Sequence, residues 1–91
     1  MNQQKIILIQ AAAYIADLTD RNHHCEALVV VADLVGIARH KAIARAIMQI
    51  RDAVGYVDEH LDAIRRDLYK SLQAAGSARF GEDWRIVWSS L

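Results

Sequence analysis

Three consecutive residues, His23, His24 and Cys25, have side chains that bind transition metals, and His40 and His60 are further candidates. A zinc site needs three or four such ligands that converge in a tetrahedron. Adjacent residues at the start of a helix point in different directions, and the sequence has no second pair of ligands at a regular short spacing. We therefore predict no metal site and no cofactor, with the two histidines in solvent and Cys25 buried as a small apolar side chain.

The carboxylates Asp58, Glu59 and Asp62 lie close together on a predicted helix. The last two form an E-x-x-D motif that resembles one half of the magnesium site in all-α nucleotide pyrophosphohydrolases of the MazG type. The other half, an E-x-x-E motif on a partner helix, is absent, and Asp62 is spaced to pair with Arg66. The sequence also has no nucleophile and base pair and no glycine-rich phosphate loop, so we predict that the protein is not an enzyme.

A basic segment follows Gly36. Arg39, Lys41 and Arg45 occur there without an intervening acid, and the last two share one helix face because they are one turn apart. The segment 32–47 resembles a helix-turn-helix, in which a glycine turn joins two helices and the second enters the major groove of DNA. The glycine fits this motif, whereas the core positions that follow it fit poorly. The basic residues predict, as an alternative function, a helix that contacts phosphates.

The charge and composition of the 91 residues favour a helical, ordered chain. Eleven Lys and Arg balance 11 Asp and Glu, so the chain lacks the basic excess that is typical of nucleic-acid-binding proteins. There is no proline and there are only four glycines, while 54% of the residues are apolar. Such a chain has few helix breakers and enough apolar surface to avoid disorder. We predict a single all-α domain over residues 1–91.

Glycines and polar clusters divide the chain into four helices and a short C-terminal helix. Gly36, Gly55 and Gly76 are placed to end the second, third and fourth helices. We expect a compact bundle with long helices near residues 3–19, 23–35, 38–54 and 56–75, a turn at 77–81 and a short helix at 84–91.

The first two predicted helices are apolar on almost every side. Gln10 and Asp17 in the first helix, and Glu26 and Asp33 in the second, are seven residues apart and therefore lie on one narrow face of each helix. Helices that are apolar on most faces must be covered on several sides. We predict that one chain cannot cover the hairpin 6–35, and that it forms the centre of a homo-oligomer, most simply a two-fold dimer.

Aromatic residues are the candidate binding groups. Trp84 and Trp88 are of the type that dominates protein interfaces, and Tyr14 and Tyr56 could bind a partner or line a pocket between helices. We expect a non-enzymatic interaction module that binds a macromolecular partner or a small ligand; the alternative is a DNA-binding regulator that uses the basic helix 38–51. The single cysteine fits the cytoplasm, and the apolar N-terminal stretch is too short to cross a membrane.

Overall fold

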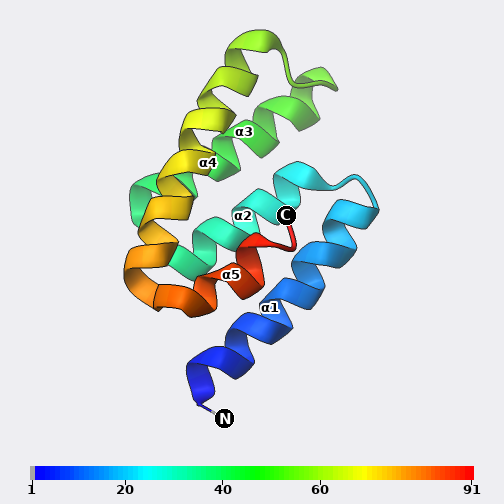
Figure 1. The fold of residues 1–91 in the computed structure, drawn as a ribbon. Helices are drawn as coiled ribbons and strands as arrows, with labels where there is room; N and C mark the ends of the chain where they lie inside the picture. The colour runs from blue at the N-terminus through cyan, green and yellow to red at the C-terminus, as the bar shows by residue number, and fades with distance from the viewer. Residues whose placement is uncertain (1) are drawn as a thin grey trace.

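The computed structural model describes residues 2–91, and the described chain is helical without strands (Figure 1). It confirms the predicted all-α bundle of four long helices and a short C-terminal helix. Its dimensions are 44 × 25 × 17 Å. The elements are α1 (Gln3–Asp20), α2 (His24–Val35), α3 (Ala38–Val54), α4 (Glu59–Phe80), the 3₁₀ helix η1 (Gly81–Asp83) and α5 (Trp84–Trp88).

Capping residues set the helix boundaries. Gly36 ends α2 in the left-handed conformation (φ +77°), which glycine adopts without a steric penalty, as the sequence predicted. The predicted start of α4 at Tyr56 was two to three residues too early. Asp58 is the N-cap of α4, because its side chain accepts a hydrogen bond of 2.7 Å from the backbone N–H of Leu61. Tyr56 therefore lies in the turn before the helix.

The predicted end of α4 at Gly76 was wrong. The helix continues through this glycine to Phe80, and the expected turn at 77–81 is its last turn followed by the first residue of η1. Gly76 is buried against the indole ring of Trp84: a Cβ atom there would lie 2.0 Å from Cε2 of that ring. The glycine is needed for this close approach, and the chain instead leaves the helix at Gly81.

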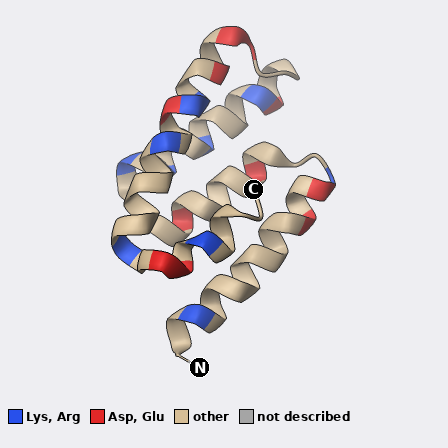
Figure 2. Cartoon of the chain, in the orientation of Figure 1, with Lys and Arg blue, Asp and Glu red and all other residues tan. Residues whose placement is uncertain are grey.

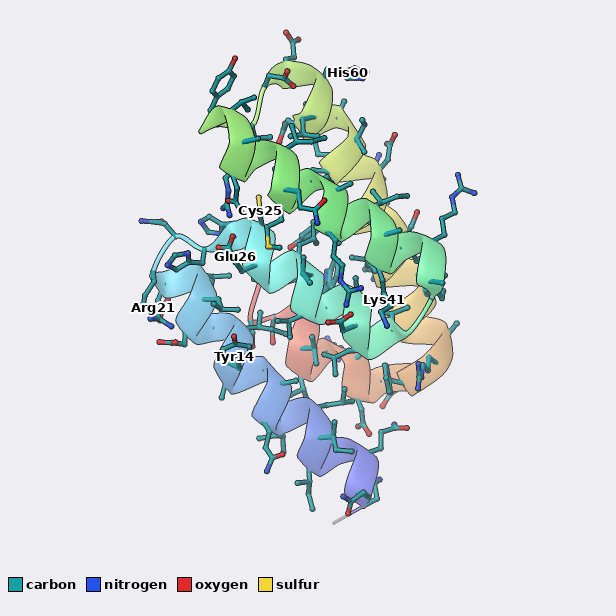
Figure 3. The ribbon with its side chains drawn as sticks, turned by 180° about the vertical axis from the view of Figure 1, so that it is seen from behind. Tyr14, Arg21, Cys25, Glu26, Lys41 and His60 are labelled. Carbon is teal, nitrogen blue, oxygen red and sulfur yellow. The ribbon has the colours of Figure 1, made fainter. Side chains whose placement is uncertain are left out.

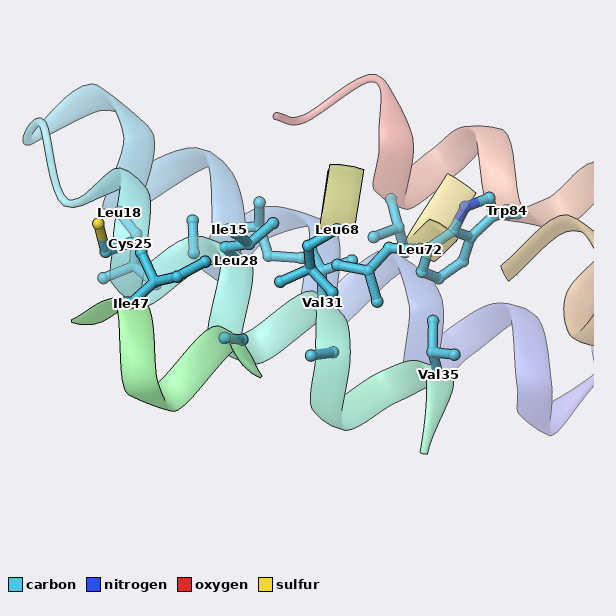
Figure 4. Packing of buried hydrophobic residues seen from close by; sticks show 14 of the residues in the cluster. Ile15, Leu18, Cys25, Leu28, Val31, Val35, Ile47, Leu68, Leu72 and Trp84 are labelled. Atoms are coloured by element: carbon cyan, nitrogen blue, oxygen red, sulfur yellow. The ribbon is translucent and has the colours of Figure 1, made fainter. Parts of the chain in front are cut away.

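Helix α2 occupies the centre of the bundle and packs against α1, α3 and α4. The buried side chains follow α2 along its length, from Cys25 to Val35 (Figure 4). Ala27, Val31 and Ala32 are completely inaccessible to solvent. The expectation that one chain cannot cover this helix was therefore wrong, because α3 and α4 supply the cover that the sequence pattern alone did not reveal.

Helix α1 is covered on one side only. Its buried residues, Leu8, Ala12, Ile15 and Leu18, follow one face, which packs against α2 and α5. The remaining apolar side chains of α1 stay at the surface of the single chain. The apolar residues of α2 are thus mostly buried within the single chain, whereas part of the apolar surface of α1 stays exposed.

Candidate interaction surface

A stripe of five residues runs along the uncovered side of α1. Lys5, Ile9, Ala13, Ala16 and Asp20 are three or four residues apart, so they lie in line on the helix surface. Ile9 is 43% exposed, and Ala13 is exposed while Ala16 is half-buried. We call these five residues the α1 stripe. Its middle is apolar and its two ends carry opposite charges.

The charges at the two ends of the α1 stripe are unpaired. Within residues 2–91, neither Lys5 nor Asp20 has an oppositely charged group within 4.0 Å. The residues are separated by about 22 Å along the helix axis. Figure 2 shows the helix as a long uncharged segment between a basic residue near its start and acidic residues near its end. The stripe therefore has a positive end and a negative end.

A second apolar edge lies on the other side of the polar face of α1. Ile7 is 46% exposed and Tyr14 is 54% exposed. Gln10 and Asp17 separate this edge from the α1 stripe, as their seven-residue spacing predicted. Asp17 is bound by Arg21 at 2.6 Å, and both side chains are more than half exposed. Figure 3 shows Tyr14 in the middle of α1 and Arg21 at its end.

Neither tryptophan is fully exposed, as an anchor for a partner would be. Trp84 is 2% exposed and stacks on Phe80 with 5.4 Å between ring centroids. Trp88 is half-buried and contacts Tyr69 at 4.5 Å. Trp84 is therefore a core residue, and the Nε1 atom of its ring has no hydrogen-bond partner among residues 2–91. A partner could reach Trp88 only at its exposed edge.

Tyr14 and Tyr56 are both accessible but do not form a joint site. Tyr56 is 62% exposed and lines a hollow of about 350 Å³ together with Cys25 and Arg51. Tyr14 lies on α1 and does not line that hollow. The structure thus places two of the four predicted partner-binding residues at the surface, on separate elements.

Asp33 on α2 binds two of the three predicted basic side chains of α3. The carboxylate of Asp33 lies 3.7 Å from Nζ of Lys41 and 3.3 Å from Nη2 of Arg45. Arg39 is exposed and has no such partner in the described part of the chain. A phosphate would have to compete with Asp33 for two of the three predicted contacts, so the fold does not present this helix as a free basic surface. DNA binding by α3 stays a prediction.

Glu26 and Arg51 form a second link between α2 and α3. Burial opposes ionisation of Glu26, but hydrogen bonds from Arg51 and His23 outweigh it and hold the pKa of the carboxyl below its usual value. The hydrogen bonds of Arg51 to Glu26 and to Asp52 raise the pKa of its guanidinium. Cys25 is the neighbour of this pair, and burial raises the pKa of its thiol. The ion pair links the start of α2 to α3, and the burial of Cys25 disfavours the thiolate, which is the reactive form of a cysteine.

The remaining polar motifs have structural contacts. Asp62 binds Arg65 at 2.8 Å and Arg66 at 3.1 Å, which confirms the predicted pairing with Arg66. In the described range 2–91, no three His, Cys, Asp or Glu side chains converge in a way that could hold a metal ion. None of the helices in that range combines the length and the apolar character that a membrane crossing requires.

Comparison of the chain with protein-family models, with curated proteins and with solved structures found no match. The most distinctive surface of the chain is the α1 stripe, an exposed apolar line with an unpaired charge of opposite sign at each end.

Proposed function

We propose that this protein is a non-enzymatic helical interaction module that forms a two-fold dimer through the α1 stripe. The observation that carries the proposal is the pair of free opposite charges, Lys5 and Asp20, at the ends of an exposed apolar line. A two-fold interface uses the same patch on both subunits, so the patch must be complementary to itself. The α1 stripe meets this requirement.

Antiparallel packing of two copies of α1 pairs each residue with the one equally far from the midpoint between residues 12 and 13. Lys5 of one copy then lies opposite Asp20 of the other, and Ile9 lies opposite Ala16. Ala13 falls beside the two-fold axis, where its small side chain allows close approach of the helices. Parallel packing would place like charges together at both ends, which is unfavourable.

The position of Ile9 allows an estimate of its effect on dimer stability. Full burial of an isoleucine side chain is worth about 1.5–3 kcal/mol, so burial of the 43% that is exposed is worth about 1 kcal/mol. The dimer contains this contact twice. Replacing Ile9 by Gln should therefore raise the dissociation constant roughly 30-fold.

Sedimentation equilibrium of the wild type and two variants tests the proposal. The wild type should reach twice the 10.2 kDa mass of the chain, and Ile9→Gln should shift the equilibrium toward the monomer. Ile50→Gln is the matched control, because Ile50 is 47% exposed but lies on α3. A monomeric wild type at high micromolar concentration, or an equal effect of the two substitutions, would contradict the proposal.

Two further features belong to the same proposal. A second macromolecule could bind the edge with Ile7 and Tyr14, which the α1 stripe leaves free in the dimer. The single cysteine, buried Cys25, supports a location in the reducing cytoplasm. Retention of the wild type on duplex DNA at low salt, lost steeply as salt rises, would instead favour the DNA-binding hypothesis.

A further inference from the structure

A hollow of about 390 Å³ lies between the end of α1, the start of α2 and the middle of α4. This volume is within the range of pockets that hold small molecules. Arg65, Arg66 and Lys70 line it from α4 and His24 lines it from α2, while Leu28 and Tyr69 contribute apolar surface. No Asp or Glu side chain is among its lining residues in the described chain. The hollow thus combines basic and apolar walls.

The basic groups of the hollow are only partly neutralised. Arg65 and Arg66 share one carboxylate, that of Asp62, which lies outside the hollow's lining. Lys70 has no carboxylate within 4.0 Å among residues 2–91. Three positive side-chain charges therefore face two carboxylates, that of Asp62 and the one at the end of the described chain on Leu91, which also lines the hollow, so an anion there would still meet an excess of positive charge.

The start of α2 lies beside the same site, because His24 is among the residues that line the hollow. His24 is the first residue of this 12-residue helix, and the preceding His23 makes no side-chain capping bond to the first turn. Uncapped N–H groups and the helix dipole favour an anion at this end. The basic side chains of α4 and the N-terminus of α2 thus favour a ligand of the same charge.

We propose that this hollow binds a small organic anion, in which a phosphate or carboxylate group is attached to an aromatic or aliphatic body. The anionic group contacts Lys70 and the start of α2, and the body packs on Tyr69 and Leu28. Leu28 is 3% exposed and fixed in the core, so this wall is preformed. None of the five residues of the α1 stripe lines this hollow.

Isothermal titration calorimetry of the full chain with phenyl phosphate, benzoate and inorganic phosphate tests the site. Phenyl phosphate and benzoate should both bind more tightly than inorganic phosphate, because only they fill the apolar wall, and the tighter of the two identifies the preferred anionic group. Lys70→Gln should weaken phenyl phosphate binding about tenfold by removing one charge-assisted hydrogen bond.

Arg85→Gln is the matched control, because Arg85 is also exposed and has no carboxylate within 4.0 Å among residues 2–91, but it does not line the hollow. It should leave the affinity for phenyl phosphate unchanged. Equal weakening by the two substitutions overturns the proposal, as does an affinity for inorganic phosphate that matches the affinity for phenyl phosphate.

Discussion

The close contact between Gly76 and Trp84 determines how the substitution Gly76→Ala should change the stability of the protein. Glycine in the middle of an exposed helix costs about 1 kcal/mol relative to alanine, so Gly76→Ala would ordinarily stabilise α4. Here the added Cβ would lie 2.0 Å from Cε2 and 2.4 Å from Cδ2 and Cζ2 of the indole. Real Cβ atoms do not approach other atoms this closely, so either α4 or the ring must move.

The structure leaves the ring little room to move. Trp84 is 2% exposed and is held between Gly76 and the stacked ring of Phe80. Overpacking of this kind costs about 3 kcal/mol, at the upper end of the usual range. After subtraction of the gain in helix propensity, Gly76→Ala should destabilise the protein by about 2 kcal/mol. For a chain of this size the melting temperature should fall by roughly 8–16 °C.

Thermal and urea unfolding followed by circular dichroism measure this effect. Ala74→Gly is the control for helix propensity, because Ala74 is exposed on the same helix and should lose only about 1 kcal/mol. In combination with Trp84→Leu, Gly76→Ala should be much less damaging than it is alone, because the clash is removed. The reasoning is refuted if Gly76→Ala melts at or above the temperature of the wild type.

Two other predictions concern the start of α2. Because the pKa of folded Glu26 lies below its ordinary value of 4.5, the stabilisation it provides is present above that value and is lost as the pH falls through the folded pKa. Glu26→Gln should therefore be about 1 kcal/mol less stable than the wild type at pH 7, and urea titrations at lower pH should show this difference vanish. Cys25 is 5% exposed, and burial raises the pKa of its thiol. A thiol reagent at pH 8 should therefore label native Cys25 only as fast as the protein opens, whereas it should label the unfolded protein in urea at once. Rapid labelling of the native protein would contradict the burial of Cys25.

Helix boundaries that depend on local chemistry could be predicted from the sequence. Gly36 and Gly55 end α2 and α3 as expected, because a left-handed residue after a helix is a local requirement. Gly76 misled the prediction because a glycine that stops a helix and one that admits a neighbouring ring are identical in sequence. Only the position of Trp84 in the folded chain distinguishes them.

The surfaces were predicted less well than the fold, because they depend on which helices pack together. Glu26 and Asp33 mark the same narrow polar face that Gln10 and Asp17 mark on α1, yet α2 is central and α1 is peripheral. The hollow combines residues of three helices with Leu91 beyond the last helix, so no local sequence pattern predicts it. The one local sign of the hollow in the sequence is that Arg66 and Lys70 lie one turn apart on α4.

Charge reversal at the ends of the α1 stripe tests the proposed dimer most directly. In the antiparallel arrangement, Lys5→Glu or Asp20→Lys alone sets like charges against each other at both ends, and each should raise the dissociation constant roughly tenfold. Neither change weakens α1, because an acid near its start and a base near its end favour the helix. The decisive measurement is the dissociation constant of the double variant at low salt. In an antiparallel dimer the double variant regains the wild-type dissociation constant. A dissociation constant raised by the combined losses of the two single variants would contradict this dimer.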